Sequence, residues 1–279
     1  MSERNGDGEA LDRLLERSKA LELAIIDLLD ADGYQVYDDS ARIAASHAAC
    51  SVSLEHSQGL RMLIGEGLPT SGVSLMRLQH EALTRAVWLF YAASDEAVKT
   101  FVTPLTPATE KVASKLPMLA GMLDAIVGKA PPAAMQMLTQ FKDVHAAALN
   151  SFVHGGLHPI KRLAEGYPVP LLMQVVQNSN GLLTGTGMLL AILSGKAAVA
   201  KKMAAIQPAF ADCLPQPGTP LPACPARPQH QRPRSAHGAR CALSNSLRRG
   251  CRARPGTARR RTRLGQPEPP RASIPTVAA

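Results

Sequence analysis

The sequence predicts an all-α protein, a helical bundle of about six to eight helices. Hydrophobic residues make up 46% of the 279 residues, which is enough for a sizeable core, but aromatic residues make up only 4%. Such a composition favours helices, because strands draw on β-branched and aromatic side chains. Apolar residues recur at spacings of three and four, and no segment alternates convincingly between apolar and polar residues.

Three long helices are expected at the start of the chain. The first covers residues 9–30, where leucines and isoleucines recur every three or four residues up to the sequence ADG. The second begins at Ser40, whose hydroxyl suits the N-cap position, and runs to the break at residues 65–69. The third opens at Thr70 or Ser71 and continues through VSLMRLQHEALTRAVWLFYAA.

Four more helices complete the expected bundle over residues 9–206. A short helix starts at Asp95, the next near Pro107 with a kink at Pro117, the sixth at Pro131 and Pro132, and the last at Pro168 or Pro170. The sixth helix is expected to stop at Gly155 and Gly156, since glycine is the usual residue at a helix C-terminus. The last ends near Gly195 and the basic pair that follows it.

The composition changes abruptly after Asp212. The net charge is −3 for residues 1–212 and +12 for residues 213–279, which together give the +9 of the whole chain. The segment 213–279 holds 12 of the 22 prolines, four of the five cysteines and 13 arginines, but no lysine and no aromatic residue. Two interpretations stay open: a frameshifted C-terminus read from GC-rich DNA, or a disordered arginine-rich arm that binds nucleic acid. Both predict a tail that does not pack.

A cytoplasmic location without a membrane span is expected. The N-terminal sequence MSERNGDGEALDRL carries charges where a signal peptide needs an apolar run. The longest apolar segment, residues 169–194, is interrupted by glutamines, asparagines and a serine between residues 174 and 180. This polar cluster favours a buried core helix over a transmembrane one.

Common metal and cofactor motifs are missing from the sequence, so neither a metal nor a cofactor is expected. HEALT at residues 80–84 has Thr84 where a zinc protease helix needs its second histidine. GEGLPTSG lacks the lysine of a phosphate-binding loop, and no G-x-S-x-G elbow occurs. The cysteines match no zinc spacing, and Cys50 is most simply a small buried apolar residue.

A charged stripe runs along the otherwise apolar third helix. Arg77, Glu81 and Arg85 are spaced to form two i,i+4 ion pairs, with Ser74 and Trp88 on the same arc. The stripe is either a self-paired edge that faces water or the lining of a cleft.

The stretch AALNSFVHGG, residues 147–156, places two polar residues at the end of the sixth helix. Asn150 and His154 are four residues apart and therefore share one face, whereas His145 points nearly to the opposite side. A histidine at this position also has a structural interpretation, because an imidazolium complements the negative end of the helix dipole.

NSFVH resembles the second half of the R-N-x-x-x-H motif of HEPN domains, with matches at Asn150 and His154 and Leu149 in the position of the motif arginine. SLMRLQHEALTRAVWL together with LNSFVHGG is also similar to a group of bacterial helical proteins related to that class. Active HEPN domains are helical bundles that cleave RNA without a metal, usually as dimers with the motif facing a cleft.

The resemblance therefore implies a metal-independent ribonuclease of a toxin or defence type, with RNA and a second copy of the chain as partners. His154 would act as the base and Asn150 would orient it or hold a phosphate oxygen, while Arg77 or Arg85 would supply the cation that Leu149 cannot. The alternative is a catalytically inactive helical module that binds a protein or senses a ligand, so enzyme activity is left open. The substrate and the oligomeric state are likewise left open.

Overall fold

Helices form along the whole part of the chain that the structure describes. The computed structural model describes residues 2–31 and 33–216, and these contain ten α-helices, a short 3-10 helix at Ala211–Cys213 and no strand. The helices are α1 (Ser2–Asp30), α2 (Ala41–Gly65), α3 (Pro69–Tyr91), α4 (Asp95–Val102), α5 (Pro107–Ala113), α6 (Leu119–Ile126), α7 (Pro132–Val153), α8 (Leu157–Glu165), α9 (Val169–Leu193) and α10 (Ala197–Ala209). The predicted all-α fold is confirmed. Of the expected unpacked tail, residues 213–279, the part from 217 onward lies outside the described residues, and the expectation is wrong at Cys213, which is buried.

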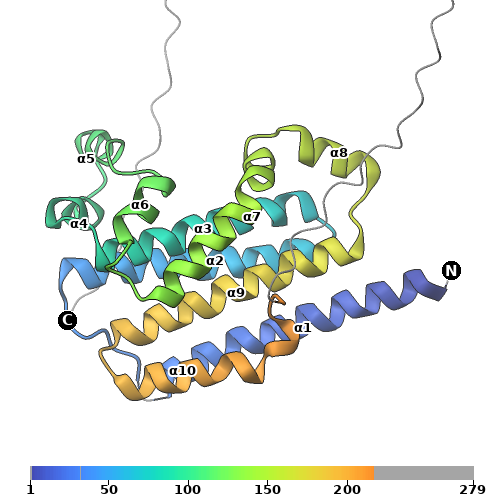
Figure 1. The fold of residues 1–279 in the computed structure, drawn as a ribbon, viewed down its shortest axis with the longest axis horizontal. Helices are drawn as coiled ribbons and strands as arrows, with labels where there is room; N and C mark the ends of the chain where they lie inside the picture. The colour runs from blue at the N-terminus through green and yellow to red at the C-terminus, as the bar shows by residue number, and fades with distance from the viewer. Residues whose placement is uncertain (1, 32, 217–279) are drawn as a thin grey trace, which may run out of the picture. The chain divides into compact units, whose positions relative to one another are not determined.

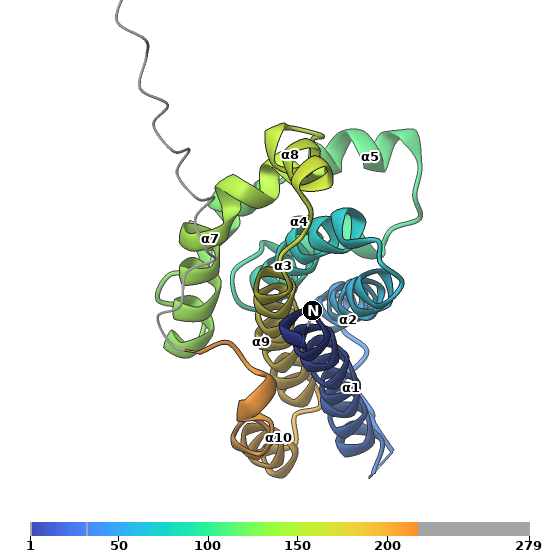
Figure 2. The same ribbon diagram turned by 90° about the vertical axis from the view of Figure 1, so that its right-hand side faces the viewer.

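Helix α9 lies in the middle of the bundle. It contacts α1, α2, α3 and α10, and Figure 2 shows these helices arranged around it. Helices α2 and α3 form a closely packed hairpin, and α7 crosses α3 on the side away from α2 (Figure 1). This arrangement explains why no residue of α9 from Leu171 to Leu193 is exposed.

The described residues contain more helices than the six to eight expected, because glycine and proline divide two of the expected helices. Pro117 falls in a break between α5 and α6 rather than in a kink, since proline lacks the N–H that would continue the helix. Gly195 has a positive φ of 67° and separates α9 from α10. In addition, the chain resumes helix at Leu157, directly after the two glycines that end α7.

Two residues of the polar cluster in α9, Ser179 and Asn180, are buried and hydrogen-bonded, as expected in a core helix. The Oγ of Ser179 donates to Oε1 of Gln79 at 2.6 Å, and Nε2 of Gln79 donates back to the carbonyl of Ser179 at 3.0 Å. Asn180 donates through Nδ2 to Oγ of Ser18 at 2.7 Å and to the carbonyl of Cys213 at 2.8 Å. Among the described residues, no helix combines the length and the apolar character needed to span a membrane.

The packed part of the chain reaches past residue 206, where the bundle was expected to end. Arg17 of α1 donates through Nε to Asp212 at 2.9 Å and lies 4.0 Å from the ring centroid of Phe210. Cys213 is fully buried, as is Cys50, which confirms the prediction that Cys50 is a buried apolar residue. These contacts attach the segment after α10 to α1 and α9.

A buried ion pair joins α1 to α2. Nη2 of Arg61 donates to Oε2 of Glu22, and the two side chains are only 8% and 13% exposed. Nη1 of Arg61 also donates to Oγ of Ser57 at 3.1 Å. Burial lowers the pKa of Arg61 even with Glu22 beside it, which shows how strongly the surroundings disfavour an uncompensated charge.

Candidate functional site

The candidate site lies where α3 and α7 cross (Figure 1). Arg77 near the start of α3 contacts Asn150 near the end of α7. One turn further along α3, Nε2 of His80 lies 3.0 Å from the carbonyl of Leu138, which is much earlier in α7. The two helices therefore run in opposite directions across this contact.

Arg77 is the centre of the polar contacts at this crossing. It donates to Oε1 of Glu81 through Nε at 2.9 Å and through Nη2 at 2.5 Å, and its Nη1 donates to Oδ1 of Asn150. The side chain of Arg77 is 15% exposed and that of Glu81 is 30% exposed, so this part of the charged stripe is half-buried rather than an open edge. A guanidinium has five N–H donors, and three are used here, so two remain for a ligand such as a phosphate.

His154 caps the end of α7 beside this cluster. Its backbone N–H donates to the carbonyl of Asn150 at 3.1 Å, and Gly155 then turns the chain with a positive φ of 63°, as expected at a helix C-terminus. The His154 side chain is exposed and makes no polar contact with another described residue. One helical turn, about 6 Å along the axis, separates it from Asn150, which contacts Arg77, and its side chain is accessible.

Arg85 lies apart from the other candidate residues. It follows Arg77 by two turns of α3, about 12 Å along the axis, in the direction that leads away from His154 because the two helices are antiparallel. Among the described residues it forms no ion pair, so the second pair expected with Glu81 is absent. Of the two arginines proposed as the cation, the structure brings Arg77 to Asn150 and leaves Arg85 outside.

Leu149, which stands in the position of the HEPN motif arginine, points into the core. It is only 1% exposed and belongs to the main cluster of buried apolar side chains. Because adjacent helical residues point about 100° apart, Leu149 faces inward while Asn150 faces Arg77. The arginine at this site therefore comes from a different helix than the motif would place it on.

Two histidines and a phenylalanine from α3 and α7, whose proximity the sequence did not predict, meet beneath the crossing. The rings of His80 and Phe141 stack with centroids 4.5 Å apart, and Phe141 meets His145 edge-on at 4.8 Å. Both histidines are buried, and Nδ1 of His145 has no hydrogen-bond partner. The i,i+4 spacing of Phe141 and His145 places them on one face of α7, but only the packing of α3 shows that His80 joins them.

Burial lowers the pKa of both histidines. The pKa of His80 falls to about 4, because burial penalises the charged ring more than the hydrogen bond to Leu138 favours it, and Arg77 and His145 add to the effect. Burial also lowers the pKa of His145, against a hydrogen bond with Asn178 that raises it. Both rings are therefore neutral at physiological pH.

We expect the protein to lose stability as the pH falls from neutral, because unfolded histidine binds a proton near pH 6.5 while His80 in the fold does not until about pH 4. This difference contributes stability above pH 6.5 that is lost progressively below it. Glutamine in place of His80 keeps a donor for the Leu138 carbonyl but does not titrate. In the His80→Gln variant, the fall in the free energy of unfolding between about pH 7 and pH 4.5 should therefore be about 2 to 3 kcal/mol smaller than in the wild type. Urea unfolding at several pH values measures it, and equal pH dependence in both proteins would contradict the prediction.

The described residues offer no evident metal site. No group of three or more histidine, cysteine, aspartate or glutamate side chains gathers in residues 2–31 and 33–216 in a way that could hold a metal ion. The chemistry that the α3–α7 site can perform with its own side chains is hydrogen bonding to an anion through Arg77 and proton exchange at His154.

A comparison with protein families matches residues 50–216 to a family of unknown function, DUF6988. The chain belongs to this family. The DUF6988 match ends where the described structure ends and includes all of α3, α7 and α9, so the candidate site lies within the family region. Neither a search of curated proteins nor a search of solved structures found a match.

Proposed function

We propose that the surface formed by Arg77, Asn150 and His154 cleaves RNA without a metal ion, as the resemblance to HEPN domains implies. The observation that supports this proposal is the hydrogen bond from Arg77 to Asn150, which joins residues 73 positions apart. A cation thus contacts Asn150, one of the two matched motif residues, although the motif arginine itself is replaced by Leu149.

The proposed reaction divides the work between two side chains. His154 takes the proton of an RNA 2′-hydroxyl, whose oxygen then attacks the adjacent phosphorus. The bond to the 5′-oxygen breaks, that oxygen takes a proton from water, and the products carry a 2′,3′-cyclic phosphate and a 5′-hydroxyl. The two free N–H groups of Arg77 stabilise the charge that grows on the phosphate oxygens. Asn150 holds Arg77 in place.

Cleavage of labelled RNA by the full-length chain in excess chelator tests the proposal. His154→Ala should lower the rate by about 10²- to 10⁴-fold, because the base is lost. Arg77→Ala should lower it by about 10²- to 10³-fold, because the transition state loses its cation. His158→Ala is the matched control for the histidine, and Arg85→Ala removes the same charge at a position away from His154. Both should retain cleavage.

Other outcomes of this assay would show which of the assigned roles is wrong. Cleavage that survives His154→Ala refutes the assigned base, and a loss with Arg85→Ala but not with Arg77→Ala moves the cation to Arg85. The resemblance also implies that the active form is a dimer, and sedimentation velocity on the same preparation measures this.

A second candidate function, a catalytically inactive helical module, is favoured by the pairing of Arg77 with Glu81. Glu81 accepts two hydrogen bonds from Arg77 through one carboxylate oxygen. Its negative charge therefore offsets much of the positive charge that would attract a phosphate. Under this alternative the contact holds α3 against α7, and the wild-type chain cleaves neither structured nor unstructured RNA.

A further inference from the structure

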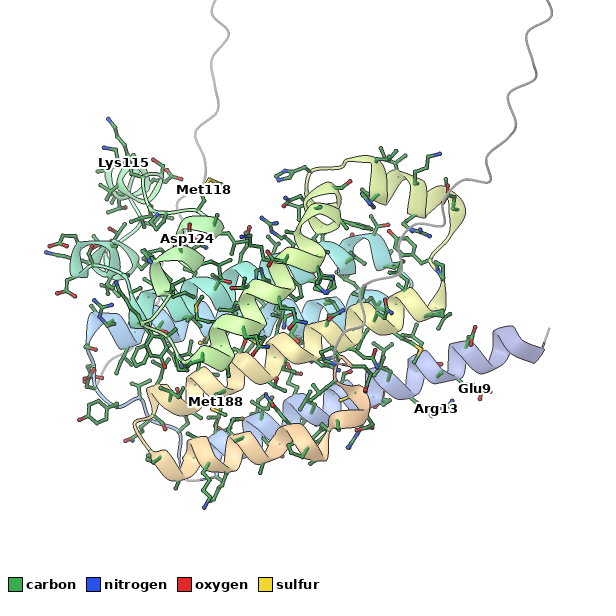
Figure 3. All side chains as sticks on the ribbon, in the orientation of Figure 1. Glu9, Arg13, Lys115, Met118, Asp124 and Met188 are labelled. Carbon is green, nitrogen blue, oxygen red and sulfur yellow. The ribbon has the colours of Figure 1, made fainter. Side chains whose placement is uncertain are left out.

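A cavity of about 640 Å³ lies between α3, α7, α9 and α10, on the side of α3 that faces away from α2. Its walls include Leu83 on α3, Met137 on α7, Met188 on α9 and Ala204 on α10. Met188 is labelled in Figure 3, where it lies on α9 beside α10. The volume is in the range of about 300 to 1,000 Å³ that is typical of small-molecule pockets.

The walls of this cavity carry no charged side chain. Most of the lining is aliphatic, and two flexible methionines, Met137 and Met188, can adapt to the shape of an occupant. Three residues add polar groups: Tyr91, Thr184 and Gln207. The hydroxyl of Tyr91 makes no hydrogen bond with another described residue, and Nε2 of Gln207 makes only a long one, 3.4 Å, to Thr184.

Glycine on α9 keeps this space open. A Cβ at Gly185 would lie 2.7 Å from Cε of Met137, so a larger residue there would push the methionine toward the cavity. Gly181 is another lining residue on the same helix, and a Cβ there would lie 3.1 Å from Pro215. The space is open to solvent on one side, where Gln207 is exposed, and a concave, mainly apolar space of this size with a few polar groups is typical of a small-molecule site.

We propose that this cavity binds a neutral, mainly apolar small molecule that carries one hydrogen-bonding group. The uncharged walls match a neutral molecule, since a charged one would lose its hydration without gaining a counter-charge. The hydroxyl of Tyr91 and the amide of Gln207 can pair with the single polar group. The concave shape, lined by four helices and open on one side, suits a small molecule better than the flat surface of a folded partner.

The neutral fluorescent probe N-phenyl-1-naphthylamine tests the proposal with the full-length chain. We expect saturable fluorescence enhancement at one probe per chain. Ala204 lines the cavity and is exposed, so Ala204→Phe should fill the opening without disturbing the fold and weaken probe binding by about tenfold or more. Ala205→Phe is the matched control, because Ala205 is exposed on the same helix but does not line the cavity. It should bind the probe like the wild type.

A second substitution and a measurement of the oligomeric state complete the test. Ala134→Phe, on the α7 wall, should give the same loss as Ala204→Phe. Absence of saturable binding by the full-length chain overturns the proposal. Equal weakening by Ala204→Phe and Ala205→Phe also overturns it. The proposal is also overturned if sedimentation velocity shows a dimer that Ala204→Phe dissociates and Ala205→Phe does not. In that case a second copy of the chain occupies the cavity.

Discussion

Replacing Glu22 by alanine is expected to destabilise the protein by about 3 to 5 kcal/mol, because it leaves the charge of Arg61 buried without a counter-ion. The Arg61 side chain is only 8% exposed, so water cannot replace the lost carboxylate. The hydrogen bond to Ser57 remains, but a hydroxyl does not neutralise a guanidinium. Urea unfolding of wild type and variant measures the difference in the free energy of unfolding.

The pair of Arg13 and Glu9, labelled in Figure 3 near the start of α1, provides the control. Its side chains are 70% and 71% exposed with charged atoms 3.6 Å apart, so Glu9→Ala should cost less than about 1 kcal/mol. Replacing Glu22 and Arg61 together by methionine should recover most of the stability, since no buried charge is then left unpaired. A loss with Glu22→Ala no larger than that with Glu9→Ala would show that Arg61 is solvated in solution.

Replacing Leu149 by arginine, which restores the full motif of HEPN domains, is expected to destabilise the fold and not to create a better ribonuclease. Leu149 is 1% exposed in the core, so the substitution removes packed apolar volume and introduces a buried cation. The combined cost should be at least about 3 kcal/mol. Urea unfolding and the RNA cleavage assay, carried out on the same preparation, measure both effects.

Ala147→Arg is the control for this substitution, because Ala147 is exposed on the same helix. An added arginine at a solvated helical position should change stability by no more than about 0.5 kcal/mol. If Leu149→Arg were as stable as Ala147→Arg and cleaved RNA faster than the wild type, position 149 would reach the site after all.

Local sequence signals predicted the helices and several of their ends. Apolar spacing identified α1, α2 and α3, Ser40 caps α2 through its hydroxyl, and Gly155 ends α7 in the left-handed region. The number of helices was underestimated because Pro117 interrupts the chain completely and because the chain resumes helix soon after the glycines at positions 156 and 195. Whether a proline bends or breaks a helix depends on the packing of the segments on either side, which no local pattern contains.

The candidate site, like the fold, was predicted only in part by the sequence. That Asn150 and His154 share one face follows from their four-residue spacing within a single helix, where the backbone geometry alone sets the relative direction of side chains. The choice of Arg77 over Arg85 depends instead on how α7 crosses α3, and the sequence left both open.

By itself, then, the sequence determined the helical class, the position of the buried polar helix and the shared face of Asn150 and His154, because each depends on residues a few positions apart. Only the tertiary structure decided that Arg61 pairs with Glu22, that Leu149 faces the core and that four helices enclose a cavity. These features join residues far apart in the chain. They depend on the simultaneous close packing of several helices, in which the position of each side chain is set by its neighbours on other elements.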